Sequence, residues 1–197
     1  MGVLCQNKRM GTIEKRLFTA IELPGTWLGA IESTCMELKR QDVRGRFVPP
    51  ERLHLTLNFL GESKKEVQIA DLLKTLDRSV PPLIRAGEGG LFRRRRGGDL
   101  IVWHLRPDEA LKAYRKAEME ALSAIGIQMD RRPYAPHLTL VRDAEGAFLN
   151  TAAFITVFDR PLDFAASELV LFWSRFDRGR LVYTPLGRFP FGGRGGK

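Results

Sequence analysis

Three histidines are present in the 197-residue sequence, and two of them open the same tetrapeptide. His54 begins a His-Leu-Thr-Leu segment, and His137 begins a second copy in the other half of the chain. A β-strand alternates its side chains with a period of two, so each histidine shares a face with the threonine two positions later. The sequence therefore predicts two strands that each present an imidazole and a hydroxyl on one face.

These residue types suit the hydrolysis of a phosphodiester. One imidazole can accept a proton from water while the other donates one to the departing oxygen, since an unperturbed pKa of about 6.5 keeps both forms accessible. The hydroxyls of Thr56 and Thr139 can hydrogen-bond the non-bridging phosphate oxygens. This scheme requires neither a metal nor another cofactor. The residues alone do not indicate which histidine is the acid and which is the base.

A guanidinium near the phosphate would support this chemistry, and Arg142 is the candidate. Strict alternation places Arg142 on the leucine face of its strand unless the strand bulges or ends at Val141. The same alternation predicts that Leu53, Leu55, Leu57 and Phe59 point into the core.

Alternating strand and helix patterns surround both motifs and predict an α+β protein. Strands are expected over residues 17–23, 53–60, 137–141, 168–173 and 180–186, with two more between 83 and 105. Helices are expected from Pro24 to about residue 40, around 69–76, and from Asp108 to Ile125, where Gly126 would end the helix. The order helix, glycine, prolines and His-Leu-Thr-Leu occurs twice, which suggests a duplicated fold with two facing lobes.

The residues around the motifs resemble the RNA 2′,3′-cyclic phosphodiesterase (LigT-like) branch of the two-histidine (2H) phosphoesterases. The resemblance rests on the segments RLFTAIELP (16–24), PPERLHLTLNFLG (49–61) and RPYAPHLTLVR (132–142), and it covers roughly residues 16–190. It implies a bilobal fold in which two antiparallel β-sheets form a V-shaped cleft, with helices outside. It also implies hydrolysis of a terminal 2′,3′-cyclic phosphate to a 2′-phosphomonoester, and in some members reversible 2′–5′ RNA ligation.

The resemblance also assigns roles. His54 would donate a proton to the departing 3′ oxygen, His137 would activate water, and Thr56 and Thr139 would cradle the phosphate. The expected partner is an RNA with a 2′,3′-cyclic phosphate end, with tRNA fragments among the candidates. Two positions depart from the family pattern, because Asn58 stands where a basic residue is common and Tyr134 where Phe is more usual. Tyr134 is expected to stack on a terminal base.

Composition narrows the class of partner and the compartment. With 32 Lys and Arg against 23 Asp and Glu, the formal charge of +9 favours an anionic partner. The arginine run 93–96 is expected to be a solvated loop, and whether it also grips RNA phosphates stays open. Only two cysteines occur, which fits a reducing, cytoplasmic location. No segment is apolar enough to predict a signal peptide or a membrane span.

The domain prediction has three parts: a flexible extension over residues 1–15, with Met10 as an alternative start, a single domain over 16–190, and a flexible Gly/Arg-rich tail over 191–197. A monomer is expected because one chain holds both motifs. Two other functions stay open, namely an RNA-end-binding module with vestigial catalysis, and a phosphodiesterase acting on small cyclic nucleotides or 2′–5′ oligonucleotides. A zinc site is disfavoured because the histidines lack ligand spacing, and a structural or surface role is expected for His104.

Overall fold

Strands and helices alternate along the part of the chain that the computed structural model describes, residues 13–95, 97–130 and 132–192. The strands are β1 (Lys15–Glu22), β2 (Arg44–Phe47), β3 (His54–Ser63), β4 (Leu83–Phe92), β5 (Asp99–Pro107), β6 (His137–Glu145), β7 (Asp163–Ala165), β8 (Glu168–Asp177) and β9 (Arg180–Pro190). The α-helices are α1 (Gly25–Arg40), α2 (Glu66–Thr75), α3 (Glu109–Ala124) and α4 (Ala153–Thr156), and short 3-10 helices span Pro50–Arg52 and Ala147–Asn150.

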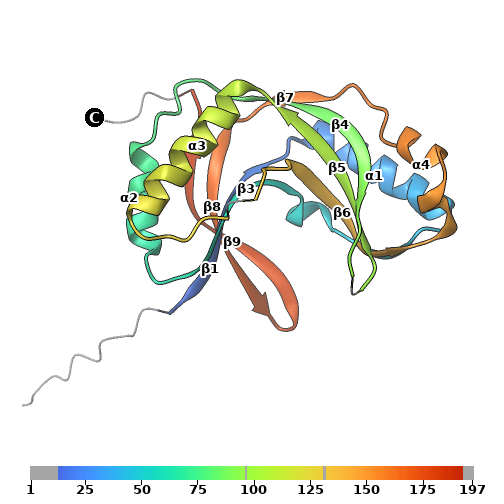
Figure 1. Ribbon diagram of the computed structural model, residues 1–197, viewed down its shortest axis with the longest axis horizontal. Coiled ribbons are helices and arrows are strands. Elements are labelled where there is room, and N and C mark those ends of the chain that lie inside the picture. The colour runs from blue at the N-terminus through green and yellow to red at the C-terminus, as the bar shows by residue number, and fades with distance from the viewer. Residues whose placement is uncertain (1–12, 96, 131, 193–197) are drawn as a thin grey trace, which may run out of the picture.

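The strands form two antiparallel sheets. The first sheet has the order β3-β1-β8-β9, and the second has the order β2-β6-β5-β4-β7. The turn ends of the β8–β9 and β4–β5 hairpins lie on the same side of the molecule (Figure 1). These findings confirm the expected α+β fold of two antiparallel sheets with helices outside.

Each sheet is covered by one helix that follows one of its own strands and by one helix that follows a strand of the other sheet. Helices α2 and α3 pack on the first sheet, whereas α1 and α4 pack on the second (Figure 1). Trp27 of α1 is fully buried, with its ring centroid 5.9 Å from that of Trp103 in β5. Tyr114 of α3 packs edge-on against Phe191, which follows β9. The two lobes are therefore interleaved, and one hydrophobic cluster joins them.

Local signals explain where the long helices begin and end. Pro24 precedes α1, where its missing N–H would have no helical acceptor, and Lys39 and Arg40 lie in its last turn, next to the negative end of the helix dipole. The Asp108 carboxylate caps α3 by accepting a hydrogen bond from the backbone N–H of Leu111. Gly126, with φ of +80°, follows α3 in the left-handed conformation that glycine tolerates best. The predicted stop is confirmed.

The sequence patterns missed β2, β7, α4 and the 3-10 helices. Strand β2 consists of Arg-Gly-Arg-Phe and carries no alternating apolar pattern, so its pairing with β6 defines it. Strand β7 has only three residues and pairs with β4 at the sheet edge. Such short elements take their conformation from their neighbours and leave little local signal.

The structure covers only part of the predicted termini. Strand β1 begins at Lys15, inside the predicted 1–15 extension. Residues 1–12, with Cys5 and Met10, and residues 193–197 lie outside the described residues. Among the helices that the structure describes, none is long and apolar enough to cross a membrane.

Candidate active site

The two motif strands come from different sheets and face one cavity. Strand β3 is the edge strand of the first sheet, and β6 lies between β2 and β5 in the second. A cavity of about 400 Å³ is lined by the side chains of His54, Thr56, His137 and Thr139. The predicted alternation is confirmed, since the leucines between these residues, Leu55 and Leu138, are fully buried. The fold thus brings two imidazoles and two hydroxyls, far apart in sequence, to one place.

Both histidines are held in the same way by their own strand. The Nδ1 of His54 lies 2.8 Å from the carbonyl oxygen of Arg52, and the Nδ1 of His137 lies 2.7 Å from that of Ala135. A carbonyl oxygen can only accept, so each Nδ1 carries the hydrogen. The Nε2 of each neutral ring is therefore the atom left to accept a proton.

Aromatic rings pack against both imidazoles. The ring centroid of His54 lies 5.0 Å from Phe18 and 5.2 Å from Tyr183, which meets it edge-on. The ring of His137 meets Phe92 edge-on at 4.8 Å. Phe92, the last residue of β4, therefore lies beside the second motif histidine. His104 faces His137 across the β5–β6 ladder but is not among the residues that line the cavity.

Burial sets the titration of the two imidazoles. It lowers the pKa of His54 to about 4, and the charges of Arg142 and His137 lower it further, against the opposing bond to the Arg52 carbonyl. Burial likewise lowers the pKa of His137, with smaller contributions in the same direction from His104 and Arg142. Both rings are therefore neutral at pH 7 when the cavity holds no anion.

A β-bulge in β3 changes which side chains reach the cavity. Thr56 pairs with Ala20 and Asn58 with Thr19, so Leu57 is the extra residue on β3. Asn58 consequently turns inward and is 3% exposed, whereas Phe59 is 56% exposed and lines the cavity. The prediction that Phe59 points into the core is wrong, because strict alternation holds only for a strand without a bulge.

A bulge at the matching position in β6 brings Arg142 to the site. Thr139 pairs with Val102 and Val141 with Ile101, which leaves Leu140 as the extra residue. Leu140 and Val141 are both fully buried, and Arg142 then returns to the cavity face. The predicted condition for a role of Arg142, a bulge near Val141, is met.

Tyr134 is not brought to this cavity. Its hydroxyl donates a hydrogen bond to the carbonyl oxygen of Thr56 at 3.0 Å, and the guanidinium of Arg115 lies 4.1 Å from its ring centroid. Arg115 Nε also donates to the carbonyl oxygen of Leu57 at 3.0 Å. Both ring and hydroxyl are thus engaged by the protein, so the expected base stacking on Tyr134 does not fit. Tyr134 instead ties the segment before the second motif to the strand of the first.

A buried polar group lies behind the same bulge. Thr19, Asn58 and Glu118 are at most 3% exposed, and Thr19 and Asn58 are neighbours across the β1–β3 ladder. Burial raises the pKa of Glu118 to about 7, and Thr19 and Asn58 oppose this rise. Within the described residues, the Glu118 oxygens have no partner in hydrogen-bonding geometry. Glu118 is therefore easily protonated near neutral pH.

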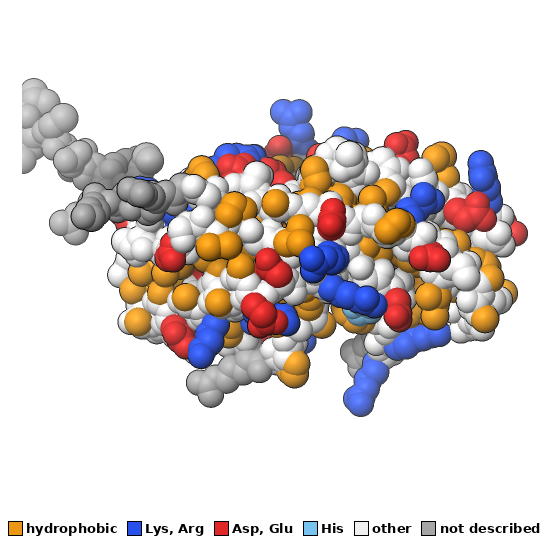
Figure 2. All heavy atoms as spheres, turned by 90° about the horizontal axis from the view of Figure 1, so that it is seen from above, with side chains coloured by type: hydrophobic (Ala, Val, Ile, Leu, Met, Phe, Trp, Pro, Cys, Tyr) orange, Lys and Arg blue, Asp and Glu red, His pale blue; other side chains and the backbone are white. Residues whose placement is uncertain are grey.

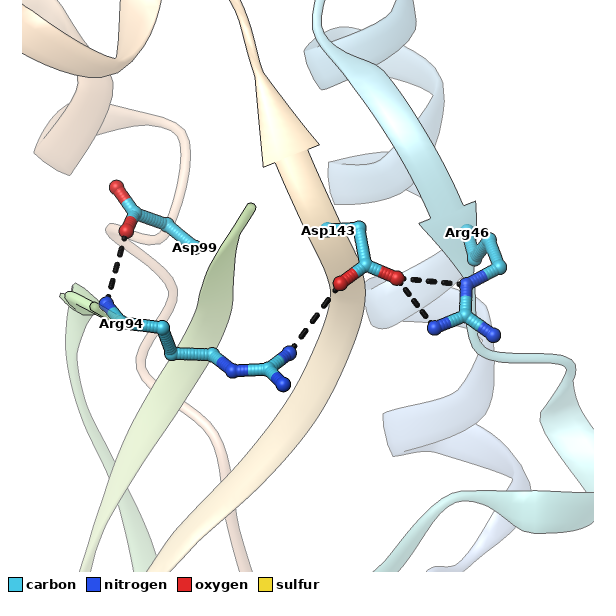
Figure 3. Close-up of polar contacts among 4 residues, drawn as sticks. All are labelled: Arg46, Arg94, Asp99 and Asp143. Atoms are coloured by element: carbon cyan, nitrogen blue, oxygen red, sulfur yellow. Dashed lines mark hydrogen bonds and ion pairs between the residues drawn. The ribbon is translucent and has the colours of Figure 1, made fainter. Parts of the chain in front are cut away.

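Two arginines of the run are paired with acidic side chains: Arg94 with Asp143 near the end of β6, and Arg93 with Asp99 at the start of β5. Asp143 accepts hydrogen bonds from Arg94 Nη1 at 3.2 Å and from Arg46 Nε at 2.8 Å, and Asp99 accepts one from the Arg94 backbone N–H (Figure 3). Arg93 pairs with Asp99 at 2.5 Å. The absence of a side chain at Gly98 lets the loop approach Asp143 closely, because a Cβ there would lie 2.5 Å from the Asp143 backbone. These pairings favour an anchoring role for Arg93 and Arg94. Arg96 lies outside the described residues.

Other residues of the cavity wall were missed by sequence reasoning. Arg16 and Arg52 lie within two of the segments that carry the family resemblance, 16–24 and 49–61, and this was the available signal for them. The others carry no motif and comprise Val48, which follows β2, and residues in strands of the first sheet: Leu17, Phe18, Phe59, Ser174, Phe176, Leu181 and Tyr183. Pairing within the first sheet brings its strand residues together, and Val48 is held by the hydrogen bond that its backbone N–H donates to the carbonyl oxygen of Leu140 in β6.

A single chain whose two sheets each supply a His-x-Thr face to one cavity belongs to the class of two-histidine phosphoesterases. The profile described as "LigT like Phosphoesterase" matches residues 21–103. An RNA 2′,3′-cyclic phosphodiesterase of Escherichia coli is 31% identical over 190 residues, covering 89% of this chain and 96% of that protein. An RNA 2′,3′-cyclic phosphodiesterase of Geobacillus stearothermophilus is 28% identical over 154 residues, and the match covers 73% of this chain and 47% of that protein.

A solved structure agrees with these sequence relatives. Escherichia coli LigT complexed with 3′-AMP superposes with a TM-score of 0.69 at 31% identity, covering 91% of this chain and 99% of that one. The chain belongs to the LigT-like phosphoesterase family.

Proposed function

We propose that this protein is an RNA 2′,3′-cyclic phosphodiesterase that opens a terminal cyclic phosphate to a 2′-phosphomonoester. The observation that carries this proposal is the convergence of His54, Thr56, His137 and Thr139 on one cavity. The names of the relatives and the shared fold support the same reaction. Arg142 adds a positive charge to the cavity, as binding of a phosphodiester anion requires.

In the proposed step, Nε2 of His137 takes a proton from water while the water oxygen bonds to phosphorus. The bond between phosphorus and O3′ breaks, and the Nε2–H of protonated His54 supplies the proton to O3′. Thr56, Thr139 and Arg142 hold the non-bridging oxygens as charge builds on them. The product keeps its phosphate on O2′, and proton exchange with solvent restores the two imidazoles.

Protonation of His54 needs an explanation because burial favours its neutral form. A bound phosphodiester places a negative charge beside both rings, and an opposite charge within a few ångströms raises a histidine pKa. Substrate binding therefore supplies the condition under which one imidazole holds the proton that it donates. The Nδ1 bonds to backbone carbonyls are compatible with both the neutral and the doubly protonated ring.

Ligation is part of the proposal as the same step with a different nucleophile. A 5′-hydroxyl in place of water would attack phosphorus, O3′ would leave again, and the phosphate would remain on O2′. The linkage formed is then 2′–5′. This follows from the identity of the leaving oxygen and would need a second RNA end positioned near His137.

The test is ring opening in excess EDTA, with a short RNA that carries a 2′,3′-cyclic phosphate and with adenosine 3′,5′-cyclic phosphate as the comparison substrate. A 2′-phosphate end on the RNA is expected, identified by mass and by comparison with synthetic 2′- and 3′-phosphate standards. A 3′-phosphate would contradict the assignment of O3′ as leaving group. An intact ring with retained RNA binding would favour the binding-module alternative, and turnover of the cyclic mononucleotide alone would favour the small-substrate alternative.

Variants separate the histidine mechanism from other causes of activity. His54→Ala and His137→Ala are each expected to lower kcat/KM by about 10²- to 10⁴-fold, the range for loss of a general acid or base. His104→Gln serves as the matched control, because that ring does not line the cavity, and it should keep ring opening with at most a shifted pH dependence. Full activity in either motif variant would contradict the mechanism.

The proposal includes one domain over residues 16–190, a monomer, and a cytoplasmic location. One chain supplies both motif strands, and one hydrophobic cluster spans both sheets, which supports a self-sufficient monomer. Within the described residues Cys35 forms no disulfide, which supports a reducing compartment. Light scattering on the purified protein at assay concentration tests the monomer, and cell fractionation tests the location.

A further inference from the structure

The cavity extends from the histidines along the first sheet toward the turn of the β8–β9 hairpin. Successive cross-strand rows line this path. Behind the Phe18 and Phe59 row come Arg16 and Ser174, which pair across β1 and β8. Phe176 and Leu181, paired across β8 and β9, form the outer row. All of these side chains line the same cavity as the histidines.

The length of this path exceeds what a single phosphate needs. Ala20 pairs with Thr56, and Arg16 lies four residues back along the same strand. At about 3.3 Å per residue, the two positions are about 13 Å apart. A phosphate held at Thr56 would leave room for its nucleoside before the Arg16 row is reached. A guanidinium in that row is therefore placed to meet the next phosphodiester along an RNA strand.

The outer row offers an aromatic face to solvent. Phe176 is 76% exposed and lines the cavity together with Phe59 and Leu181, and a cluster of exposed apolar side chains beside a cavity is a feature of binding sites. Nucleobases stack on such faces without sequence preference. Phe59, 56% exposed through the β3 bulge, offers a second face nearer the histidines. The path thus presents an aromatic side chain, a guanidinium, and another aromatic side chain in order.

The charges of the lining fit a polyanion. Arg16, Arg52 and Arg142 line the cavity, and no Asp or Glu side chain is among the described residues that do so. Arg16 forms no ion pair within the described part of the chain. On the face that Figure 2 shows, by contrast, Lys and Arg side chains are interspersed with Asp and Glu side chains. Three guanidinium groups therefore lie in the cavity lining, and the one carboxylate next to them in the strand register is Glu62, the partner of Arg16 on β3, which is not a lining residue.

We propose that Arg16, Ser174 and Phe176 form a subsite for the nucleotide upstream of the cyclic end, with Arg16 on the linking phosphodiester and Phe176 under the upstream base. This inference rests on the proposed function and deepens it, because it makes an RNA end rather than a mononucleotide the preferred substrate. Ser174, paired with Arg16, supplies a hydroxyl to the same phosphodiester. The Arg16 guanidinium and the Ser174 hydroxyl lie away from the reacting bond, so they should affect substrate affinity rather than the chemical step.

The test compares two substrates that end in the same group, adenosine 2′,3′-cyclic phosphate and the trinucleotide ApApA with a 2′,3′-cyclic phosphate end. The quantity measured is the ratio of kcat/KM for the trinucleotide to kcat/KM for the mononucleotide. The variants are Arg16→Gln and Phe176→Ala, with Arg40→Gln and Ile155→Ala as matched controls, because these exposed residues lie outside the cavity lining. Thermal unfolding of each variant checks that the fold is kept.

Wild-type protein should prefer the trinucleotide, and each cavity variant should reduce that ratio by about tenfold through KM, the effect of losing one stacking or phosphate contact. The control variants should keep the wild-type ratio. A ratio near one in wild-type protein, or a ratio that neither cavity variant changes, would overturn the subsite while ring opening still supported the proposed function. Failure of wild-type protein to open either ring would overturn the proposed function and the subsite with it.

Discussion

The imidazoles of His54 and His137 each hold one nitrogen against a backbone carbonyl, and both residues are half-buried. Burial and the nearby positive charge of Arg142 favour the neutral ring in each case. An acid–base pair needs one ring protonated and one neutral. Glu22 raises the pKa of His54 only as the smallest of the contributions, so the negative charge that favours a protonated ring at neutral pH comes mainly from the bound phosphodiester.

The pH dependence of the reaction follows from this. The profile of kcat/KM reports the free protein, in which both histidine pKa values lie below 6.5, with His54 at about 4, so its bell should be centred on the acidic side of 6.5. The profile of kcat reports the bound state, in which the substrate anion raises both pKa values. We expect the kcat bell to lie at higher pH than the kcat/KM bell, measured by steady-state kinetics between pH 4 and 9.

The relative positions of the kcat and kcat/KM profiles test whether the bound substrate raises the histidine pKa values. Coincident bells would show that the bound anion does not shift the imidazoles, and a kcat/KM bell centred above pH 7 would contradict the effect of burial. Repeating the series with His104→Gln gives a control, because that variant alters one neighbouring charge and leaves both catalytic rings in place.

Strand β3 owes its catalytic face to contacts from behind. Tyr134 and Arg115 donate hydrogen bonds to the carbonyl oxygens of Thr56 and Leu57, the two residues at the bulge. Bulges leave backbone groups unpaired in the ladder, and buried carbonyls need partners. Helix α3 and the segment before β6 therefore hold the bulge that aims Thr56 at the cavity. The same contacts join the two motifs mechanically.

Removing the Tyr134 hydroxyl should therefore affect catalysis although it lies outside the cavity. Tyr134→Phe leaves the Thr56 carbonyl without a donor, and we expect a loss of about 1 kcal/mol in the free energy of unfolding. Because Thr56 is proposed to stabilise the transition state, kcat should fall several-fold with little change in KM.

Arg115→Gln should have a larger effect of the same kind, since it also removes the cation stacked on the ring. Lys116→Gln, on the exposed face of α3, is the control and should match wild-type protein. A rise in KM with unchanged kcat for Tyr134→Phe would indicate that the tyrosine contacts substrate instead of positioning the strand.

Across the whole molecule, the interleaved helices make the two lobes one packing unit. Helix α1 follows a strand of the first sheet and covers the second, and α3 follows a strand of the second sheet and covers the first (Figure 1). Neither lobe can bury its sheet without the other lobe's helix. We therefore expect a single cooperative unfolding transition, in which a change in one lobe alters the stability of both.

Glu118, buried between α3 and the first sheet, gives that transition a pH dependence. Its pKa in the folded state is about 7, above its unfolded value of about 4.5, so the folded state binds the extra proton between these limits. The contribution of Glu118 to the free energy of unfolding therefore falls as pH rises from 4.5 to 7 and stays low above pH 7. Glu118→Gln should raise the free energy of unfolding at pH 8, by on the order of 1–3 kcal/mol, and change little at pH 4.5.

Urea unfolding of wild-type protein and Glu118→Gln at pH 4.5 and pH 8 measures this difference. Glu120→Gln, on the exposed part of the same helix, should be neutral at both pH values. Equal stability of wild-type protein and Glu118→Gln at pH 8 would show that the buried carboxyl is already satisfied.

Alternation along a strand is a local property, and so the two His-x-Thr faces could be predicted from residue order. The leucines between them, buried as expected, follow from the same period of two. The long helices were predictable for a similar reason, since their spacing, caps and the terminal Gly126 act within a few residues. The resemblance to a known family supplied the two-sheet arrangement that no local pattern contains.

The bulges at Leu57 and Leu140 could not be predicted, because they arise from pairing with β1 and β5 and leave no mark in residue order. They decide that Phe59 and Arg142 face the cavity and that Asn58 does not. Tyr134 was assigned to the substrate because its ring type suits stacking, yet its position beside Arg115 commits it to the protein. Side-chain chemistry is written in the sequence, but the direction in which each group points depends on backbone hydrogen bonds between segments distant in the chain.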